Sequence, residues 1–235
     1  SGLSRDSIVI QSIECLKSQR ILNIFKNLKF NSQTVKEGNP WQEYDKKANF
    51  KLIELLDKYP KSEPGMVYQL SKHISQANLY LGNSMPIRQW DLVASTKNHL
   101  KDVLANRGAN GIDGQLSTFL GWAKESDENW AIVGDLTALY DLSALWIENQ
   151  IPVKNIKIVV INNHGGMIFN RMFKSEYFLN RHELDFSSWA NMWEWSYVKW
   201  EQIPSGDMNI SDRAVIELQP DSMQTTFFWQ EWDKI

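Results

Sequence analysis

Two apolar runs, each followed by polar residues and glycine, decide the fold: WAIVGD at residues 130–135 and IKIVVINNHGG at residues 156–166. Both runs are short and rich in β-branched residues, which is typical of strands buried on both faces of a parallel sheet. Between them, Leu136–Ile147 places leucine and tryptophan side chains at helical spacing. The sequence therefore predicts a strand, a crossover helix and a neighbouring parallel strand.

Polar groups at the ends of the two runs are expected to meet, because neighbouring parallel strands lie about 4.8 Å apart and end at the same edge of the sheet. Asp135 offers a carboxylate oxygen, Asn163 offers an amide oxygen, and the glycines that follow offer a main-chain carbonyl oxygen. Such oxygen ligands, completed by phosphate and water, suit Mg²⁺ better than zinc. The N–H groups of Leu136 and Thr137 are expected to point at the anion. The two runs together predict a site for a metal-bound diphosphate.

Strand and helix patterns alternate along the rest of the chain. This alternation predicts an α/β fold, a doubly wound and mostly parallel sheet flanked by helices, in which ligands bind beyond the carboxyl ends of the strands. The further elements expected are a helix from Glu63, a strand Ala77–Leu81, a helix after Ser84, a strand Val103–Ala105, a helix after Gly114, a strand Ala214–Leu218 and a closing helix Gln224–Ile235.

Composition narrows the class of protein. The chain has 235 residues, of which 43% are hydrophobic, so it can bury the core of one domain of about 150 to 200 residues with material to spare. A net charge of −3 gives no general field to attract nucleic acid. Cys15 is the single cysteine, which excludes an intramolecular disulfide and gives no sign of a zinc site. No apolar run approaches the length of a membrane span and no signal segment opens the chain, so a cytoplasmic location is expected.

The glycine-aspartate pair followed at this spacing by two asparagines resembles the thiamine diphosphate binding motif. The surrounding segments are similar to one family in particular, the 2-succinyl-5-enolpyruvyl-6-hydroxy-3-cyclohexene-1-carboxylate (SEPHCHC) synthases of menaquinone biosynthesis. These segments are GNSMPIR at 82–88, NRGANGIDG at 106–114, GDLTALYDL at 134–142 and NNHGGMIF at 162–169. The chain departs from the family pattern at His164, where a third asparagine is common, and in a crossover that is one residue longer.

The resemblance implies a division of the chain. Residues 1–36, with a strand at Ser7–Gln11, are expected to be the remnant of a preceding middle domain. Residues 37–61 are expected to be a connecting segment, and residues 62–235 the thiamine diphosphate-binding domain. The enzymes of the family are much longer, so the chain is expected to be the last third of one.

The resemblance also implies a cofactor site for thiamine diphosphate with Mg²⁺, or in its place Mn²⁺. The metal ligands are expected to be Asp135, Asn163 and the carbonyl group of Gly165. Ile112 is expected to hold the cofactor in a bent conformation, and Ile168 and Phe169 to line the wall of the pocket. The full set of expected cofactor-binding residues is Gly134, Asp135, Leu136, Thr137, Asn163, Gly165, Ile112, Ile168 and Phe169.

Arg88 and Arg107, with the hydroxyl group of Ser84, are expected to bind the carboxylates of the substrates, because a guanidinium group binds a carboxylate with two parallel hydrogen bonds. Without the family context, the two arginines read as surface residues or as members of structural ion pairs. The apolar pocket residues likewise read as ordinary core. His164 is expected to be a loop residue and Asp141 a structural or capping residue.

The activity that the resemblance implies is decarboxylation of 2-oxoglutarate followed by addition of the resulting succinic semialdehyde carbanion to isochorismate. The activating glutamate of this superfamily belongs to a pyrimidine-binding domain, so no catalytic residue is expected in this chain and the chain alone is expected to be inactive. Family members form homodimers or homotetramers, and the 11 tryptophans are assigned to packing and assembly.

Two other classes of function stay open. The chain could belong to another thiamine diphosphate enzyme, an acetohydroxyacid synthase or a 2-oxoacid decarboxylase, which would prefer pyruvate. It could also be a non-catalytic α/β interaction module, because Gly-Asp is common after strands and Asn-Asn-His-Gly-Gly can form an ordinary loop with positive φ angles.

Overall fold

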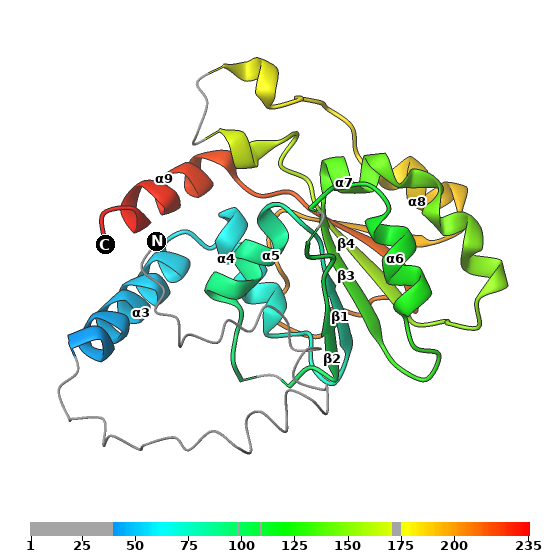
Figure 1. Ribbon diagram of the computed structural model, residues 1–235, viewed down its shortest axis with the longest axis horizontal. Coiled ribbons are helices and arrows are strands. Elements are labelled where there is room, and N and C mark those ends of the chain that lie inside the picture. The colour runs from blue at the N-terminus through cyan, green and yellow to red at the C-terminus, as the bar shows by residue number, and fades with distance from the viewer. Residues whose placement is uncertain (1–39, 98, 109, 171–174) are drawn as a thin grey trace, which may run out of the picture. The chain divides into compact units, whose positions relative to one another are not determined.

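The computed structural model describes residues 40–97, 99–108, 110–170 and 175–235 (Figure 1). The chain divides into two compact units, Ser1–Lys46 and Lys47–Ile235. Of the first unit, the described residues are those that begin helix α3 (Pro40–Lys58). The strand expected at Ser7–Gln11 lies outside the described residues. Everything below concerns the second unit.

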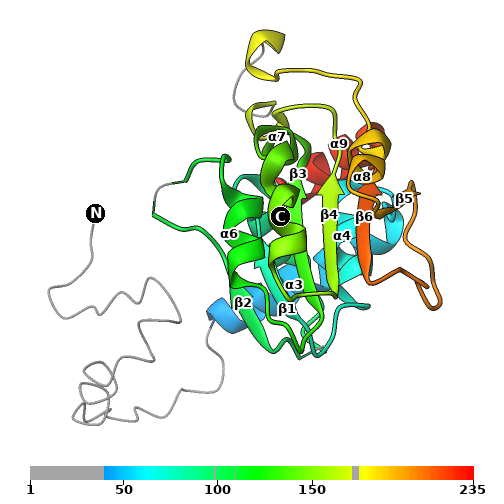
Figure 2. The same ribbon diagram turned by 90° about the vertical axis from the view of Figure 1, so that its right-hand side faces the viewer.

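The second unit is built on six parallel strands in the spatial order β2-β1-β3-β4-β6-β5 (Figure 2). The α/β fold predicted from the sequence is therefore confirmed. The chain runs from β1 to β2 on one side and returns to β3 on the other side of β1, which is the kind of switch point where α/β sheets bind ligands. The strands are β1 (Asn78–Leu81), β2 (Asp102–Leu104), β3 (Asn129–Gly134), β4 (Ile156–Ile161), β5 (Ser196–Trp200) and β6 (Arg213–Leu218).

Helices cover both faces of the sheet, with α4, α5 and α9 on one face and α6, α7 and α8 on the other (Figure 1). Successive residues of β3 show why both faces must be covered: Ile132 packs into the first layer, whereas Ala131 and Val133 pack into the second. The helices are α4 (Glu63–Ser71), α5 (Met85–Val93), α6 (Gln115–Trp122), α7 (Asp135–Tyr140), α8 (Ser187–Met192) and α9 (Ser222–Trp232), with 3₁₀ helices at η1 (Leu142–Gln150), η2 (Met167–Phe169) and η3 (Glu176–Phe178).

The crossover between β3 and β4 differs from the single helix predicted at Leu136–Ile147. It breaks at Asp141, where φ is −129° and ψ is 31°, into α7 and the 3₁₀ helix η1. The carboxylate of Asp141 accepts hydrogen bonds from the backbone N–H and the hydroxyl group of Ser117, at 2.8 and 3.0 Å. Asp141 is thus fixed to the start of α6, in agreement with its expected structural role.

Two further features were not predicted. Strand β5 lies at the edge of the sheet, and its residues before Trp200 are partly exposed, so it lacks the continuous apolar run of a central strand. Helix α3 lies within the segment 37–61, and Leu52, Leu55 and Leu56 of its second half belong to the core of the second unit. Among the described residues, no helix combines the length and the hydropathy needed to cross a bilayer.

Candidate metal and diphosphate site

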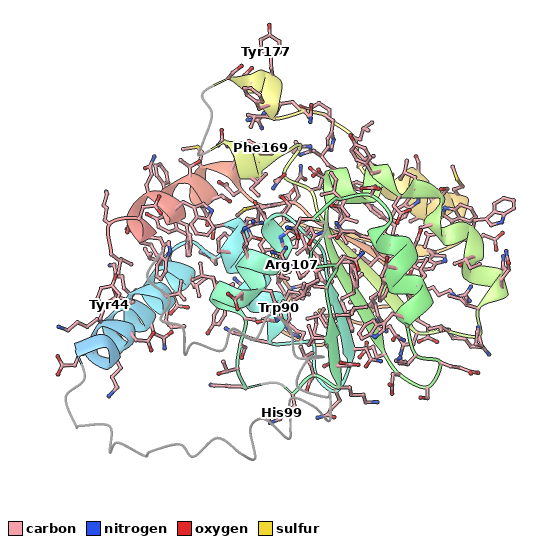
Figure 3. The ribbon with its side chains drawn as sticks, in the orientation of Figure 1. Tyr44, Trp90, His99, Arg107, Phe169 and Tyr177 are labelled. Atoms are coloured by element: carbon pink, nitrogen blue, oxygen red, sulfur yellow. The ribbon has the colours of Figure 1, made fainter. Side chains whose placement is uncertain are left out.

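A cavity of about 370 Å³ lies beyond the carboxyl ends of β1, β3 and β4, at the switch point of the sheet. In Figure 3, Phe169 lies above the sheet and His99 lies below it, with Arg107 between them. The cavity brings together every site residue that the sequence predicted, although the roles of these residues stay predictions. They are Ser84, Arg88, Arg107, Ile112, Gly134, Asp135, Leu136, Thr137, Asn163, Gly165, Ile168 and Phe169.

The register of the sheet places the two predicted clusters side by side. Gly134, the last residue of β3, pairs with Ile161, the last residue of β4, so the two strands end level with each other. Asp135 directly follows β3, and its Oδ2 atom accepts a hydrogen bond of 2.8 Å from the backbone N–H of Gly165 beyond β4. One carboxylate therefore links the ends of two neighbouring strands.

The environment of Asp135 is enclosed. Its side chain is buried, and burial raises the pKa of the carboxyl group, whereas hydrogen bonds from the backbone N–H groups of Gly165 and Leu136 lower it. His182 Nε2 lies 3.2 Å from Asp135 Oδ2. The Leu136 N–H donates to Asp135 Oδ1 at 2.7 Å, and the role of the Leu136 and Thr137 N–H groups toward a diphosphate stays a prediction.

Asn163 comes from the end of β4 and contacts a residue far away in the sequence. Its Nδ2 atom donates a hydrogen bond of 3.1 Å to Oε2 of Glu63, the first residue of α4. Among the described residues, the Asn163 Oδ1 and Glu63 Oε1 atoms are buried without a hydrogen-bond partner. Burial raises the pKa of Glu63, and the charge of Asp135 adds to this effect. The cavity thus contains two nearby carboxyl groups and one unpartnered amide oxygen.

The loop after Asn163 can be formed only with glycine at its turn. His164 has a φ of 62° and Gly165 a φ of 143°. A Cβ atom on Gly165 would lie 2.3 Å from the carbonyl oxygen of Leu179, so a side chain does not fit there. His164 is not among the residues that line the cavity, and its Nε2 atom lies 3.0 Å from Gln219 Nε2. This agrees with the loop role expected for His164.

The two arginines are fixed near the cavity by neighbouring oxygens. Arg107 Nη1 donates a hydrogen bond of 3.1 Å to Asn83 Oδ1, and Arg88 Nη1 donates one of 2.5 Å to the carbonyl oxygen of Ser84. Both arginines line the cavity, so they can present cationic groups to an anionic ligand.

Sequence reasoning missed two polar residues of the site. Glu63 was recognised only as the start of a helix, and His182 was not considered. Each lies far along the chain from its partner, and no local pattern links Glu63 to Asn163 or His182 to Asp135. An acidic residue at the start of a helical stretch with few other charged residues is the sequence signal for Glu63, and it does not point to Asn163.

The chemistry of the site suits a hard cation and a phosphate. Within the described ranges, no group of three or more His, Cys, Asp and Glu side chains could hold a metal ion. The available oxygens are instead the carboxylates of Asp135 and Glu63, the unpartnered amide oxygen of Asn163 and main-chain carbonyls of the glycine loop. Mg²⁺ is commonly bound by one or two carboxylates, with phosphate and water completing its ligands, so the residues fit a magnesium-diphosphate group.

The chain is similar in sequence to several proteins that share the same name. A Bdellovibrio bacteriovorus protein named 2-succinyl-5-enolpyruvyl-6-hydroxy-3-cyclohexene-1-carboxylate synthase is 56% identical over 182 residues, which is 77% of this chain. Proteins of the same name from Akkermansia muciniphila and Desulfitobacterium hafniense are each 34% identical, over 96% and 68% of this chain. The chain spans 35%, 43% and 30% of the lengths of these three relatives. No protein-family model matches the chain.

Proposed function

The chain belongs to the family of SEPHCHC synthases, and from this premise we propose that its second compact unit binds thiamine diphosphate through Mg²⁺. The observation that carries the proposal is the meeting of Asp135, Gly165 and the unpartnered amide oxygen of Asn163 in one cavity. The cavity is also lined by two buried carboxyl groups, Asp135 and Glu63, and a divalent ion would offset their repulsion.

Each group of lining residues has a proposed role in holding the cofactor. Asp135, Asn163 and the Gly165 carbonyl group hold the metal ion. Gly134, Leu136 and Thr137 line the diphosphate side of the cavity. The apolar residues Ile112, Ile168 and Phe169 line the part that would receive the rings of the cofactor.

The activity proposed for the complete protein is that of its family, which the names of the relatives support. Thiamine diphosphate supplies the chemistry that decarboxylates 2-oxoglutarate and transfers the remaining four-carbon unit to isochorismate. Within this chain, Arg88 and Arg107 orient the carboxylates of the substrates and Ser84 contributes a hydroxyl group. The activating glutamate is expected from a pyrimidine-binding domain, so the 235-residue chain by itself is expected to show no turnover.

The wider setting is also proposed from the family. We expect the complete enzyme to act in menaquinone biosynthesis in the cytoplasm, to assemble as a homodimer or homotetramer, and to bind no nucleic acid. The three relatives described above share one synthase name, so the acetohydroxyacid synthase, 2-oxoacid decarboxylase and non-catalytic readings are not favoured.

Isothermal titration calorimetry of the chain with thiamine diphosphate tests the cofactor proposal. Binding should require Mg²⁺, and removal of the ion with a chelator should weaken it at least tenfold, or about 1.4 kcal/mol. Thiamine without phosphate serves as the matched ligand control and should produce no comparable heat. Equal binding of thiamine and thiamine diphosphate, or no binding in the presence of Mg²⁺, would contradict the proposal.

A further inference from the structure

Glu63 has a property that packing does not explain. Its side chain is buried at the first position of α4, where one carboxylate oxygen accepts from Asn163 Nδ2 and the other has no hydrogen-bond partner among the described residues. Burial raises the pKa of this carboxyl group, and the side chain of Gln89 lies close enough to lower it by a smaller amount. A buried carboxyl group that is incompletely paired destabilises a fold, and an apolar side chain of the same size would cost less. The residue that occupies its paired oxygen is Asn163, a predicted metal ligand.

We propose that Glu63 is a positioning residue for Asn163, which holds the amide nitrogen so that the amide oxygen stays free for the cation. This inference rests on the proposed function, because it concerns the same metal site. It adds a supporting residue from α4 to a site whose predicted ligands follow β3 and β4.

The two sides of the Asn163 amide group differ in what they can bind. The oxygen of Asn163 can bind a cation, whereas its NH₂ group is a donor and cannot. A half-turn of the terminal amide group exchanges the two positions, so the side chain must be held in one orientation to serve as a ligand. Glu63 Oε2 lies 3.1 Å from Asn163 Nδ2, and in its ionised form the carboxylate can accept from the amide nitrogen but has no hydrogen to donate to the amide oxygen.

The free oxygen of Asn163 is the expected consequence of this arrangement. With its nitrogen bound to Glu63, the Oδ1 atom is buried without a partner in the described part of the chain, and Asn163 lines the cavity beside Asp135 and Gly165. An unpartnered buried oxygen costs free energy that a bound cation would recover. Residues that orient metal ligands in this way commonly change metal affinity 10- to 100-fold when they are removed.

The position of Glu63 does not depend on its own side chain. Its backbone N–H donates a hydrogen bond of 2.9 Å to the hydroxyl group of Thr225 in α9. The hydroxyl group of Ser62 caps the helix by accepting from the backbone N–H of Gly65 at 3.0 Å. Gly65 itself packs closely against the carbonyl oxygen of Tyr59. Substitutions of the Glu63 side chain should therefore leave the start of α4 in place.

The rival explanation is a purely structural one. An acidic residue in the first turn of a helix interacts favourably with the helix dipole and stabilises the helix without any ligand. This role requires the negative charge of Glu63, whereas the positioning role requires a hydrogen-bond acceptor at the right place. Glutamine keeps the acceptor and loses the charge, and methionine keeps the length and loses both.

Calorimetric titration of the chain with thiamine diphosphate and Mg²⁺ separates the two explanations. Glu63→Met should weaken Mg²⁺-dependent binding 10- to 100-fold, and Glu63→Gln should restore it to within about threefold of the unsubstituted chain. Equal binding by the unsubstituted chain and Glu63→Met would overturn the inference while the proposed function stands. Loss of binding in Glu63→Met and Glu63→Gln alike would assign the effect to charge and would also overturn it.

A second test compares the variant Asn163→Asp with the double variant Asn163→Asp/Glu63→Met, and it does not rely on the single variant Glu63→Met. A carboxylate has two equivalent oxygens, so it needs no residue to select its orientation. Adding Glu63→Met to Asn163→Asp should then cost less than twofold in binding, and a 10-fold loss would contradict the positioning role. If the unsubstituted chain itself shows no Mg²⁺-dependent binding, the proposed function fails, which is a distinct outcome from these.

Discussion

The segment from Gly134 to Gly166 and the regions that flank it contribute in different ways to the candidate site. The segment supplies the predicted ligands, Asp135, Asn163 and Gly165, at the level ends of β3 and β4. The flanking regions supply the groups that contact those ligands, namely Glu63 from α4 and His182 from the chain that follows β4. A short motif can therefore supply the atoms that bind a ligand, while contacts from distant parts of the fold determine how those atoms are oriented.

Glu217 is another residue outside the segment Gly134–Gly166 that contacts a residue of it, and it is not among the residues that line the cavity. It is fully buried in β6 and accepts hydrogen bonds from Asn162 Nδ2 at 2.9 Å, the Phe186 N–H at 2.9 Å and the Tyr197 hydroxyl group at 2.8 Å. Asn162 directly precedes the predicted ligand Asn163. Glu217 thereby connects Asn162 to two later segments of the chain. Substitutions of predicted ligands should mainly change cofactor binding, and substitutions of residues that hold the segment in place should mainly change stability.

The largest effect is expected inside the motif, at Asp135. Asp135→Ala removes the only carboxylate among the predicted metal ligands, so Mg²⁺-dependent binding of thiamine diphosphate should weaken at least about a thousandfold, or ~4 kcal/mol. Calorimetry measures the effect. Asp91→Ala, which removes an exposed carboxylate in α5, is the control and should bind normally. Unchanged binding by Asp135→Ala would show that Asp135 does not hold the metal ion.

Gly165 should rank second, through the conformation of the loop. Gly165→Ala places a Cβ atom 2.3 Å from the Leu179 carbonyl oxygen at a φ of 143°. The free energy of unfolding should fall by about 3 kcal/mol, measured by urea denaturation. Gly121→Ala is the matched control, because a Cβ atom there meets nothing within 4 Å and alanine suits the helix α6. Equal stability of the two variants would show that the loop does not require this turn.

Substitution of Glu217 should lower the stability of the fold more than it changes ligand binding in the cavity. Glu217→Leu leaves two buried donors and the half-buried Tyr197 hydroxyl group without their shared acceptor and should lower the free energy of unfolding by about 2 kcal/mol. Thermal or urea denaturation measures this loss. The exposed Glu125→Leu should change it by less than about 0.5 kcal/mol. A Glu217→Leu chain as stable as the unsubstituted one would contradict the anchoring role of this side chain.

The smallest effect is expected at His182, which contacts a ligand without being one. His182→Ala removes a contact of 3.2 Å to Asp135 Oδ2. Mg²⁺-dependent binding should weaken about three- to tenfold, or roughly 1 kcal/mol. His99→Ala, in an exposed position below the sheet (Figure 3), should have no effect on the calorimetric titration. A loss as large as that of Asp135→Ala would make His182 a ligand in its own right.

Local patterns were sufficient to predict a parallel sheet and the meeting of Asp135 with Asn163, whereas most of the other cavity residues were expected from the resemblance to the family. The buried runs of β3 and β4 define central strands, and parallel strands place their carboxyl ends together. The break at Asp141 was not predictable, since it depends on a hydrogen bond to Ser117 in another helix. Strand β5 was missed because an edge strand that is partly exposed lacks the apolar run of its neighbours. Glu63 was missed because its partner lies far along the chain.

The most direct test of the central claim is a crystal structure of the chain grown with Mn²⁺ and thiamine diphosphate, with the ion located by its anomalous scattering. We expect one Mn²⁺ ion in contact with a carboxylate oxygen of Asp135, the amide oxygen of Asn163 and the carbonyl oxygen of Gly165. The amide nitrogen of Asn163 should face Glu63. An ion bound elsewhere, or an Asn163 side chain with its nitrogen toward the ion site, would contradict the account.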